Sequence, residues 1–206
     1  MKIGAIILAA GSSSRMGKAK MLLPFGNGNM LKHIIAEVEA INLWTFCLVT
    51  GFYHEQVKSL FQDHNLPIVY NINWELGMSA SIQLGLQTLL HQHPDLEGVL
   101  IIVSDQPFLN REVLQKIVIE LRQSQKGIVA AQYGGVNGTP VLFHKKYFED
   151  LQKLTGDKGA GLILQQHFED LAVVPFPNGE FDIDTPEDYE LLCKKMKEPN
   201  VGRYIQ

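Results

Sequence analysis

The chain has 206 residues, of which 46% are hydrophobic and 19% charged, and its formal net charge is −4. This length suffices for one domain with a sizeable core, and the slight acidity argues against a general nucleic-acid or membrane-surface binder. The N-terminal apolar run Ile3–Ala10 is about half as long as a membrane span, so we expect neither a signal peptide nor an anchor. The cysteines Cys47 and Cys193 are far apart, which is typical of reduced thiols in a cytoplasmic protein.

Short apolar runs alternate with amphipathic stretches of helix length. The runs predicted as strands are Ile3–Ala9, Thr45–Thr50, Ile68–Tyr70, Gly98–Val103 and Gly127–Ala131. The stretches with apolar residues at three- and four-residue spacing, predicted as helices, are Met30–Ile41, Glu55–His64, Ser79–His91 and Asn110–Gln123. Several of the strands are apolar throughout, as expected when helices cover both faces of a sheet. The alternation predicts an α/β fold with a mostly parallel sheet and right-handed crossovers.

The later part of the chain is less regular. We expect a brief strand at Pro140–Phe143, a helix at Ala160–His167 and a strand at Leu171–Phe176. Thr185 as N-cap, Pro186 at the first helical position and Asp188 as capping-box acid predict the start of a last helix. Because no repeat or linker divides the sequence, we expect a single domain over residues 1–198, followed by a C-terminal tail over residues 199–206.

The first predicted strand runs into a small, polar and basic loop, GSSSRMGKAK. The carboxyl ends of parallel strands form the ligand-binding edge of an α/β sheet, where free amides and cations can surround phosphate oxygens. The alternative is a flexible surface turn with solvated cations. The loop is no P-loop, because five residues separate Gly11 from Gly17 and Ala19 follows Lys18. The dinucleotide fingerprint is absent as well.

The segment LAAGSSSRMGKAK (Leu8–Lys20) resembles the L-A-A-G-x-S-x-R-M-G-x-x-K signature of the MobA-like nucleotidyltransferases, and within them most resembles the molybdenum cofactor cytidylyltransferase branch. Further similar segments follow in the family's order, up to about Met196: NINWELGMSASIQLGL, VSDQPFL, GTPVLF, GDKGA and DIDTPEDY. The resemblance implies a three-layer Rossmann-like nucleotidyltransferase fold. It also implies a reaction in which an acceptor phosphate attacks the α-phosphorus of a nucleoside triphosphate and pyrophosphate leaves.

The resemblance also assigns residues to the triphosphate and to a magnesium ion. It places Arg15 and Lys20 on the phosphates as catalytic cations, beside the amides of Gly11, Ser12 and Ser13, whereas Lys18 can simply be solvated. Asp105, at the end of an apolar strand, is the expected catalytic magnesium ligand, and its alternative is a helix cap. Asp184 is the favoured second ligand, although a structural role beside the last helix is equally simple. Asp182 is a weaker candidate.

The base and ribose are expected among Leu8, Ala9, Ala10, Thr50, Asn71, Ser79 and Ser81. The Ala9-Ala10-Gly11 form of the loop implies CTP rather than GTP. Asn73 is as polar as Asn71, so that assignment can be off by two, and Ser79 or Ser81 can instead cap the following helix. Trp74 can form the floor of a site or pack in the core.

The resemblance thus implies transfer of CMP from CTP, with Mg²⁺, to molybdopterin (molybdenum cofactor) for the maturation of an apo molybdenum hydroxylase. Two departures fall where the acceptor is expected: Thr139 replaces a frequent histidine, and Gly161 replaces an arginine common after the alanine of GDKGA. Two alternatives therefore stay open. One is transfer to a sugar or alditol phosphate, and the other is a non-catalytic chaperone that carries the cofactor to its target enzyme.

Overall fold

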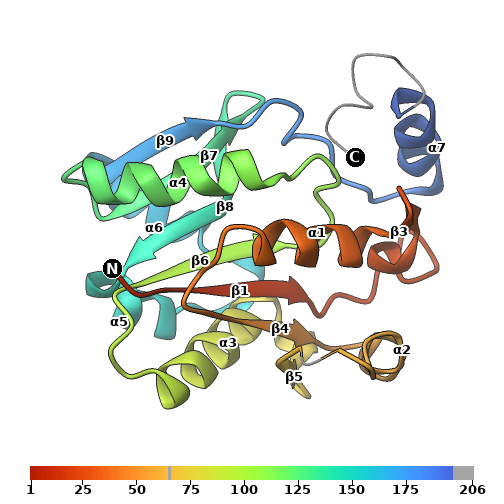
Figure 1. Ribbon diagram of the computed structural model, residues 1–206, viewed down its shortest axis with the longest axis horizontal. Coiled ribbons are helices and arrows are strands. Elements are labelled where there is room, and N and C mark those ends of the chain that lie inside the picture. Colours follow the sequence, from red (N-terminus) through yellow and green to blue (C-terminus); the bar gives the residue numbers. More distant parts are fainter. Residues whose placement is uncertain (65, 197–206) are drawn as a thin grey trace.

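The computed structural model describes residues 1–64 and 66–196, which form a seven-stranded sheet with helices on both faces (Figure 1). The strands of this sheet, in its order, are β5 (Ile68–Tyr70), β4 (Thr45–Thr50), β1 (Ile3–Ala9), β6 (Gly98–Val103), β8 (Val136–His144), β7 (Ile128–Tyr133) and β9 (Leu171–Pro175). The helices are α1 (Met30–Glu39), α2 (His54–Leu60), α3 (Met78–Gln92), α4 (Arg111–Gln123), α5 (Phe148–Gln152), α6 (Gly161–Gln166) and α7 (Pro186–Lys195). A separate two-stranded sheet contains β2 (Pro24–Phe25) and β3 (Gly28–Asn29).

The first half of the sheet is parallel. β1 pairs in parallel with β4 on one side and β6 on the other, and β4 pairs in parallel with β5. All seven residues of β1 are buried, because Ile7 packs into a core with α1 and α4 while Ile6 packs into a second core with α3. Figure 1 shows these helices on opposite sides of the sheet. The predicted three-layer α/β fold with a mostly parallel sheet is therefore confirmed.

The second half of the sheet differs from a simple continuation of this pattern. β8 is antiparallel to both β6 and β7, and β9 returns parallel to β7. β8 also begins at Val136, four residues before the predicted Pro140. Its first residues are exposed or half-buried, so no apolar run marks them, and pairing with β7 across the turn at Gly134 and Gly135 makes them a strand.

The helix starts correct two expectations. The N-cap of α3 is Gly77, and Ser79 and Ser81 lie inside the helix, so the interpretation of either serine as its cap is wrong. The N-cap of α4 is Asn110, whose side chain accepts a hydrogen bond from the amide of Val113 at 3.0 Å. Asp105 therefore does not cap that helix.

The last helix starts as predicted. The Thr185 side chain accepts a hydrogen bond from the Asp188 amide, and the Asp188 carboxylate accepts one from the Thr185 amide. Pro186 occupies the first helical position. The expected tail over residues 199–206 lies outside the described residues. Within residues 1–64 and 66–196, no helix combines the length and apolar character that crossing a membrane requires.

Candidate active site

A cavity of about 360 Å³ opens at the carboxyl edge of the parallel strands. Its size suits a small organic ligand. The loop after β1, the end of β6, and the segment that leads into α3 form most of its wall. The lining residues are Leu8, Ala9, Ala10, Gly11, Ser12, Ser13, Lys20, Met21, Trp74, Glu75, Gly77, Met78, Ser81, Val103, Ser104, Asp105 and Asp157.

The loop after β1 is folded for close approach of a ligand. Ser13 adopts a left-handed φ of 50°, and its carbonyl accepts hydrogen bonds from the amides of Met16 and Gly17. Its hydroxyl accepts a bond from the Lys20 amide at 3.3 Å. Among the hydrogen bonds within residues 1–64 and 66–196, none uses the amide of Gly11, Ser12 or Ser13 as donor. These amides are therefore available to anionic oxygens.

Lys20 lies between two acidic side chains that are 85 and 164 residues away from it in the sequence. Its Nζ is 2.5 Å from Asp105 Oδ2 and 3.1 Å from Asp184 Oδ1. Burial alone would lower the pKa of Lys20, but the charge and hydrogen bond of Asp105, assisted by Asp184, outweigh burial and raise it. The ammonium is thus held charged at the point where the two carboxylates converge.

Two further charged groups belong to the same cluster. Arg15 is largely exposed, and its guanidinium is 2.7 Å from Asp184 Oδ2. Partial removal from water, followed in importance by the negative charge of Asp105, raises the pKa of Asp182 to about 6. Asp184 is not required as a cap, because Thr185 and Asp188 form the capping box.

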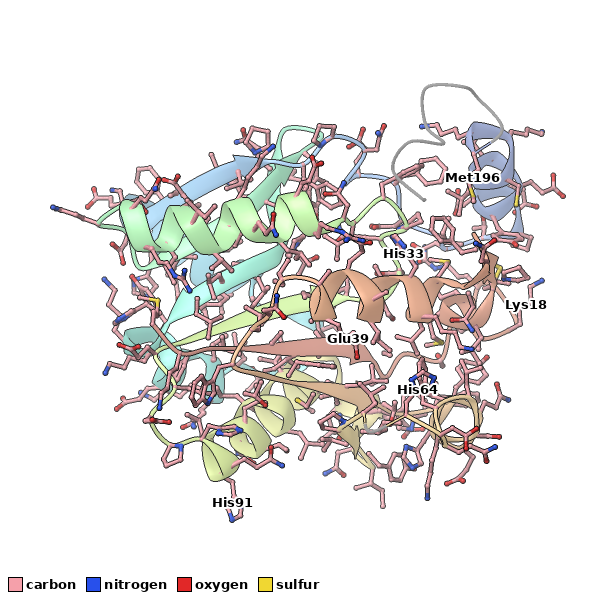
Figure 2. The ribbon with its side chains drawn as sticks, viewed as in Figure 1. Lys18, His33, Glu39, His64, His91 and Met196 are labelled. Atoms are coloured by element: carbon pink, nitrogen blue, oxygen red, sulfur yellow. The ribbon has the colours of Figure 1, made fainter. Side chains whose placement is uncertain are left out.

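The loop that carries Asp105 is attached on both sides. The buried Gln106 donates a hydrogen bond from Nε2 to the Gly179 carbonyl at 3.0 Å. His33 of α1, labelled in Figure 2, has Nε2 2.8 Å from the Leu109 carbonyl. These contacts tie the loop to α1 and to the turn at Gly179, and thereby hold the backbone that carries Asp105.

The structure places some of the expected site residues away from the cavity wall. Asn71 is buried and donates a hydrogen bond to Ser81 Oγ at 2.9 Å, so only Ser81 of this pair reaches the cavity. Ser79 is also buried, and its hydroxyl has no partner among the described residues. The buried Thr50 hydroxyl lies 2.7 Å from His54 Nδ1. Lys18 is exposed at the outer surface of this end of the molecule (Figure 2).

The cavity also contains residues to which the sequence had assigned no site role. Asp157 reaches it from the segment before α6, and Glu75 and Met78 from the segment at the start of α3. Gly77 joins these segments: it has a φ of 94°, and a Cβ there would collide with the Asp157 side chain. Both residues belong to segments that resemble the family, NINWELGMSASIQLGL and GDKGA, which indicated that the segments matter. Their separation in the sequence gave no indication that they are in contact.

The acidic cluster suits a divalent cation with oxygen ligands. Asp105 and Asp184 both approach one point, the position of Lys20 Nζ, and Mg²⁺ is commonly held by one or two carboxylates together with substrate phosphates. The described residues contain no group of three or more His, Cys, Asp or Glu side chains with metal-binding geometry. The donor set therefore fits a metal that the phosphates of a nucleotide help to hold, rather than a site built of protein ligands alone.

Comparison with known proteins finds a matching family model and curated relatives. Residues 5–171 match the family model described as the MobA-like NTP transferase domain. The bifunctional protein GlmU of Francisella tularensis subsp. novicida (strain U112) is 29% identical over 168 residues, which are 81% of this chain and 35% of that protein. The chain thus spans about a third of the length of the curated relatives it matches.

Solved structures share the fold over nearly the whole chain. Rv0371C from Mycobacterium tuberculosis H37Rv, in a complex with manganese, has a TM-score of 0.78 and 22% identity, and the match covers 94% of this chain and 99% of that one. The molybdopterin-guanine dinucleotide biosynthesis protein A from Archaeoglobus fulgidus has a TM-score of 0.64 and 17% identity, with 94% and 100% coverage. At these identities the likeness shows a common fold.

Proposed function

Because the chain belongs to the MobA-like NTP transferase family, we propose that it transfers CMP from CTP, with Mg²⁺, to molybdopterin and releases pyrophosphate. The observation that carries this proposal is the convergence of Lys20, Asp105 and Asp184 beside the loop with free amides. An anion loop, a cation and a carboxylate that line the cavity, with the second carboxylate of Asp184 bonded to the same cation, are the groups that a triphosphate and its metal require.

In the proposed reaction, an oxygen of the acceptor phosphate forms a bond to the α-phosphorus of CTP. The bond from that phosphorus to the oxygen bridging the α- and β-phosphates breaks, and pyrophosphate leaves with the electron pair. The amides of Gly11 to Ser13 hold the phosphates in line, while Lys20 and Arg15 neutralise charge on the leaving group. Asp105 and Asp184 would hold Mg²⁺, which supplies further positive charge to the triphosphate.

The choice of CTP and molybdopterin rests on sequence resemblance. The Ala9-Ala10-Gly11 form of the loop supports cytosine, and the Archaeoglobus protein, with a name that refers to molybdopterin, shares the fold. The manganese complex of Rv0371C supports a divalent cation. We further propose that the product serves an apo molybdenum hydroxylase.

One alternative acceptor is favoured by a specific observation. Gly161, at the start of α6, stands where an arginine is common in the cytidylyltransferase branch, and Thr139 of β8 replaces a frequent histidine. A protein without these groups has less cationic surface for the anionic molybdopterin. A sugar or alditol phosphate is therefore the second candidate acceptor.

A pyrophosphate-release assay tests the proposal. Purified protein is incubated with each of the four nucleoside triphosphates, with Mg²⁺ or a chelator, and with molybdopterin, a sugar phosphate, an alditol phosphate or no acceptor. Release that requires CTP, Mg²⁺ and molybdopterin is the expected result. Release dependent on the sugar or alditol phosphate would replace the acceptor. Nucleotide binding without release under any condition would contradict the enzymatic proposal and favour a cofactor carrier.

A further inference from the structure

Trp74 is the one aromatic side chain in the wall of the cavity formed by the described residues. It follows β5 and precedes α3, and it is half-buried, so part of the indole faces solvent or a ligand. Neighbouring cavity residues Gly77 and Met78 are small or flexible. An aromatic surface in a wall of otherwise aliphatic, small and polar residues is suited to a flat ring.

The indole is fixed from behind by the turn after β4. Gly51 lies so close that an added Cβ would be 2.6 Å from Trp74 Cβ and would also collide with the Ala10 carbonyl. The amide of the next residue, Phe52, donates a hydrogen bond to that same carbonyl at 3.2 Å. Trp74 is therefore packed against the backbone that supports the loop after β1 (residues 11–20), called the phosphate loop below.

Phe52 supports Trp74 from a second direction. The two ring centroids are 5.3 Å apart and the rings are nearly perpendicular, at 84°. Phe52 itself is 55% exposed and makes a similar contact with Tyr53. Because this packing is already formed, Trp74 loses little conformational freedom when a ligand binds.

The order of the strands places Trp74 at the end of the cavity opposite to the metal-binding acids. Asp105 follows β6, the phosphate loop follows β1, Gly51 follows β4, and Trp74 follows β5, and these strands are consecutive neighbours in the sheet. A nucleotide with phosphates beside Lys20 and Asp105 extends across the end of β1 toward β4 and β5. Its base then reaches the side of the cavity that Trp74 forms.

We propose that Trp74 stacks on the base of the bound nucleoside triphosphate, with Gly51 and Phe52 as the residues that position its indole. This inference rests on the proposed function, because it takes a nucleotide as the ligand. Stacking tolerates every base, since each has a π-face. Trp74 therefore contributes affinity, while hydrogen-bonding groups of the cavity select among bases.

The chain offers a direct reporter for this contact, because it contains two tryptophans. Trp44 is 55% exposed and lies beside Lys2, before the start of β4 and thus away from the carboxyl edge. Trp44→Phe leaves Trp74 as the sole source of tryptophan emission. CTP and inorganic tripolyphosphate are the two probes, because the second carries the phosphates without a base.

In the Trp44→Phe protein we expect CTP to quench Trp74 emission with saturation, and tripolyphosphate to bind with little quenching. Calorimetry of Trp74→Ala should show CTP affinity reduced roughly tenfold to a hundredfold and unchanged tripolyphosphate affinity, and Trp74→Phe should restore most of the loss. Gly51→Ala should weaken CTP binding and shift the Trp74 emission in the Trp44→Phe background, since the new methyl group displaces the indole.

Several outcomes would overturn the inference. Equal loss of both ligands in Trp74→Ala would assign the residue a structural role, and unchanged CTP affinity would remove it from the base site. Quenching by molybdopterin alone, without quenching by CTP, would move the stacking surface to the acceptor. If CTP binds the unmodified protein but Trp74 variants behave normally, only the inference fails. If no nucleoside triphosphate binds the unmodified protein, the proposed function fails with it.

Discussion

The parallel half of the sheet (β5, β4, β1 and β6) and the mixed half (β8, β7 and β9) contribute unequally to the cavity. In the parallel half every strand ends at the same edge, so the loops after β1 and β6 and the segment after β5 converge there. β8 runs in the opposite direction, and its carboxyl end lies at the far edge. Several neighbouring parallel strands thus bring their following loops to one site, whereas the loop after an antiparallel strand lies at the opposite edge of the sheet.

Asp105 lies at the boundary of the halves, and its loss should have the largest effect. We expect Asp105→Ala to reduce the rate of metal-dependent pyrophosphate release by about 10²-fold or more, because the proposed metal ligand and the partner of Lys20 are lost together. Circular dichroism and thermal melting should show a retained fold. Asp95→Ala is the matched control, since this exposed acid pairs with Lys2. A normal rate of pyrophosphate release in Asp105→Ala would show that Asp105 takes no part in the reaction.

Replacing Lys20 tests whether its ammonium, which comes from the parallel half, competes with a metal ion for the carboxylates of Asp105 and Asp184. In Lys20→Met we expect CTP affinity to fall about tenfold to a hundredfold. We also expect Mn²⁺ binding to the nucleotide-free protein to tighten by about threefold to tenfold, because the ammonium no longer neutralises Asp105 and Asp184. Calorimetry measures both affinities.

Lys18→Met is the control for Lys20→Met, because Lys18 is an exposed lysine of the same loop. It should leave Mn²⁺ affinity unchanged. If Lys20→Met binds Mn²⁺ as the unmodified protein does, Lys20 and the metal do not compete for the two carboxylates.

The same comparison explains what the sequence could predict. β1, β4 and β6 were predicted nearly to the residue, because strands covered on both faces need uninterrupted apolar runs. β8 was predicted only over its buried end, since its exposed start depends on pairing with β7 and leaves no pattern in the sequence. Local patterns record burial, while strand direction and hairpin pairing are decided by contacts distant in sequence.

The site shows the same division. Arg15, Lys20 and Asp105 could be named because they belong to a local motif or follow an apolar strand. The contact of Lys20 with Asp184 spans 164 residues, and no local signal connects them. The sequence also predicted Asn71 at the base; its side chain is buried and bonded to Ser81, which lines the cavity, and a role in base binding stays a prediction. Polar character predicts that a residue needs partners, but not whether the partner is a ligand or another side chain.

Gly161 lies where the acceptor is expected, and a cation introduced there tests how the acceptor binds. Gly161 is exposed and a Cβ at this position meets no atom within 4 Å, so the side chain of Gly161→Arg starts in open space. If the acceptor is anionic and approaches α6, the new guanidinium should lower the KM for the acceptor by about threefold to tenfold with the KM for CTP unchanged. Steady-state kinetics with each substrate varied in turn measures both values. Gly161→Gln controls for side-chain length, and an unaltered acceptor KM in Gly161→Arg would place the acceptor elsewhere.

The smallest expected effect is a pH-dependent loss of stability caused by Asp182, which lies between β9 of the mixed half and α7. Its folded pKa of about 6 lies above the unfolded value of 3.8, so the folded state keeps this proton longer than the unfolded state. The free energy of unfolding therefore decreases as pH rises from about 3.8 to about 6, and the loss persists above that range. Asp182→Asn cannot ionise, and with a chelator present we expect it to raise Tm at pH 7.5 by about 1–3 °C, with the difference vanishing below pH 4.

Asp188 provides a control of opposite sign. Hydrogen bonds from Thr185 lower the pKa of Asp188, because they favour its ionised form. Its stabilising contribution is present above the unfolded pKa and is lost as pH falls through the lower folded value. Asp188→Asn should therefore reduce Tm at pH 7.5, where Asp182→Asn raises it. Opposite effects of the two substitutions at one pH would show that ionised Asp182 lowers stability while ionised Asp188 raises it. Equal effects of the two substitutions would attribute both to the general charge of the segment instead.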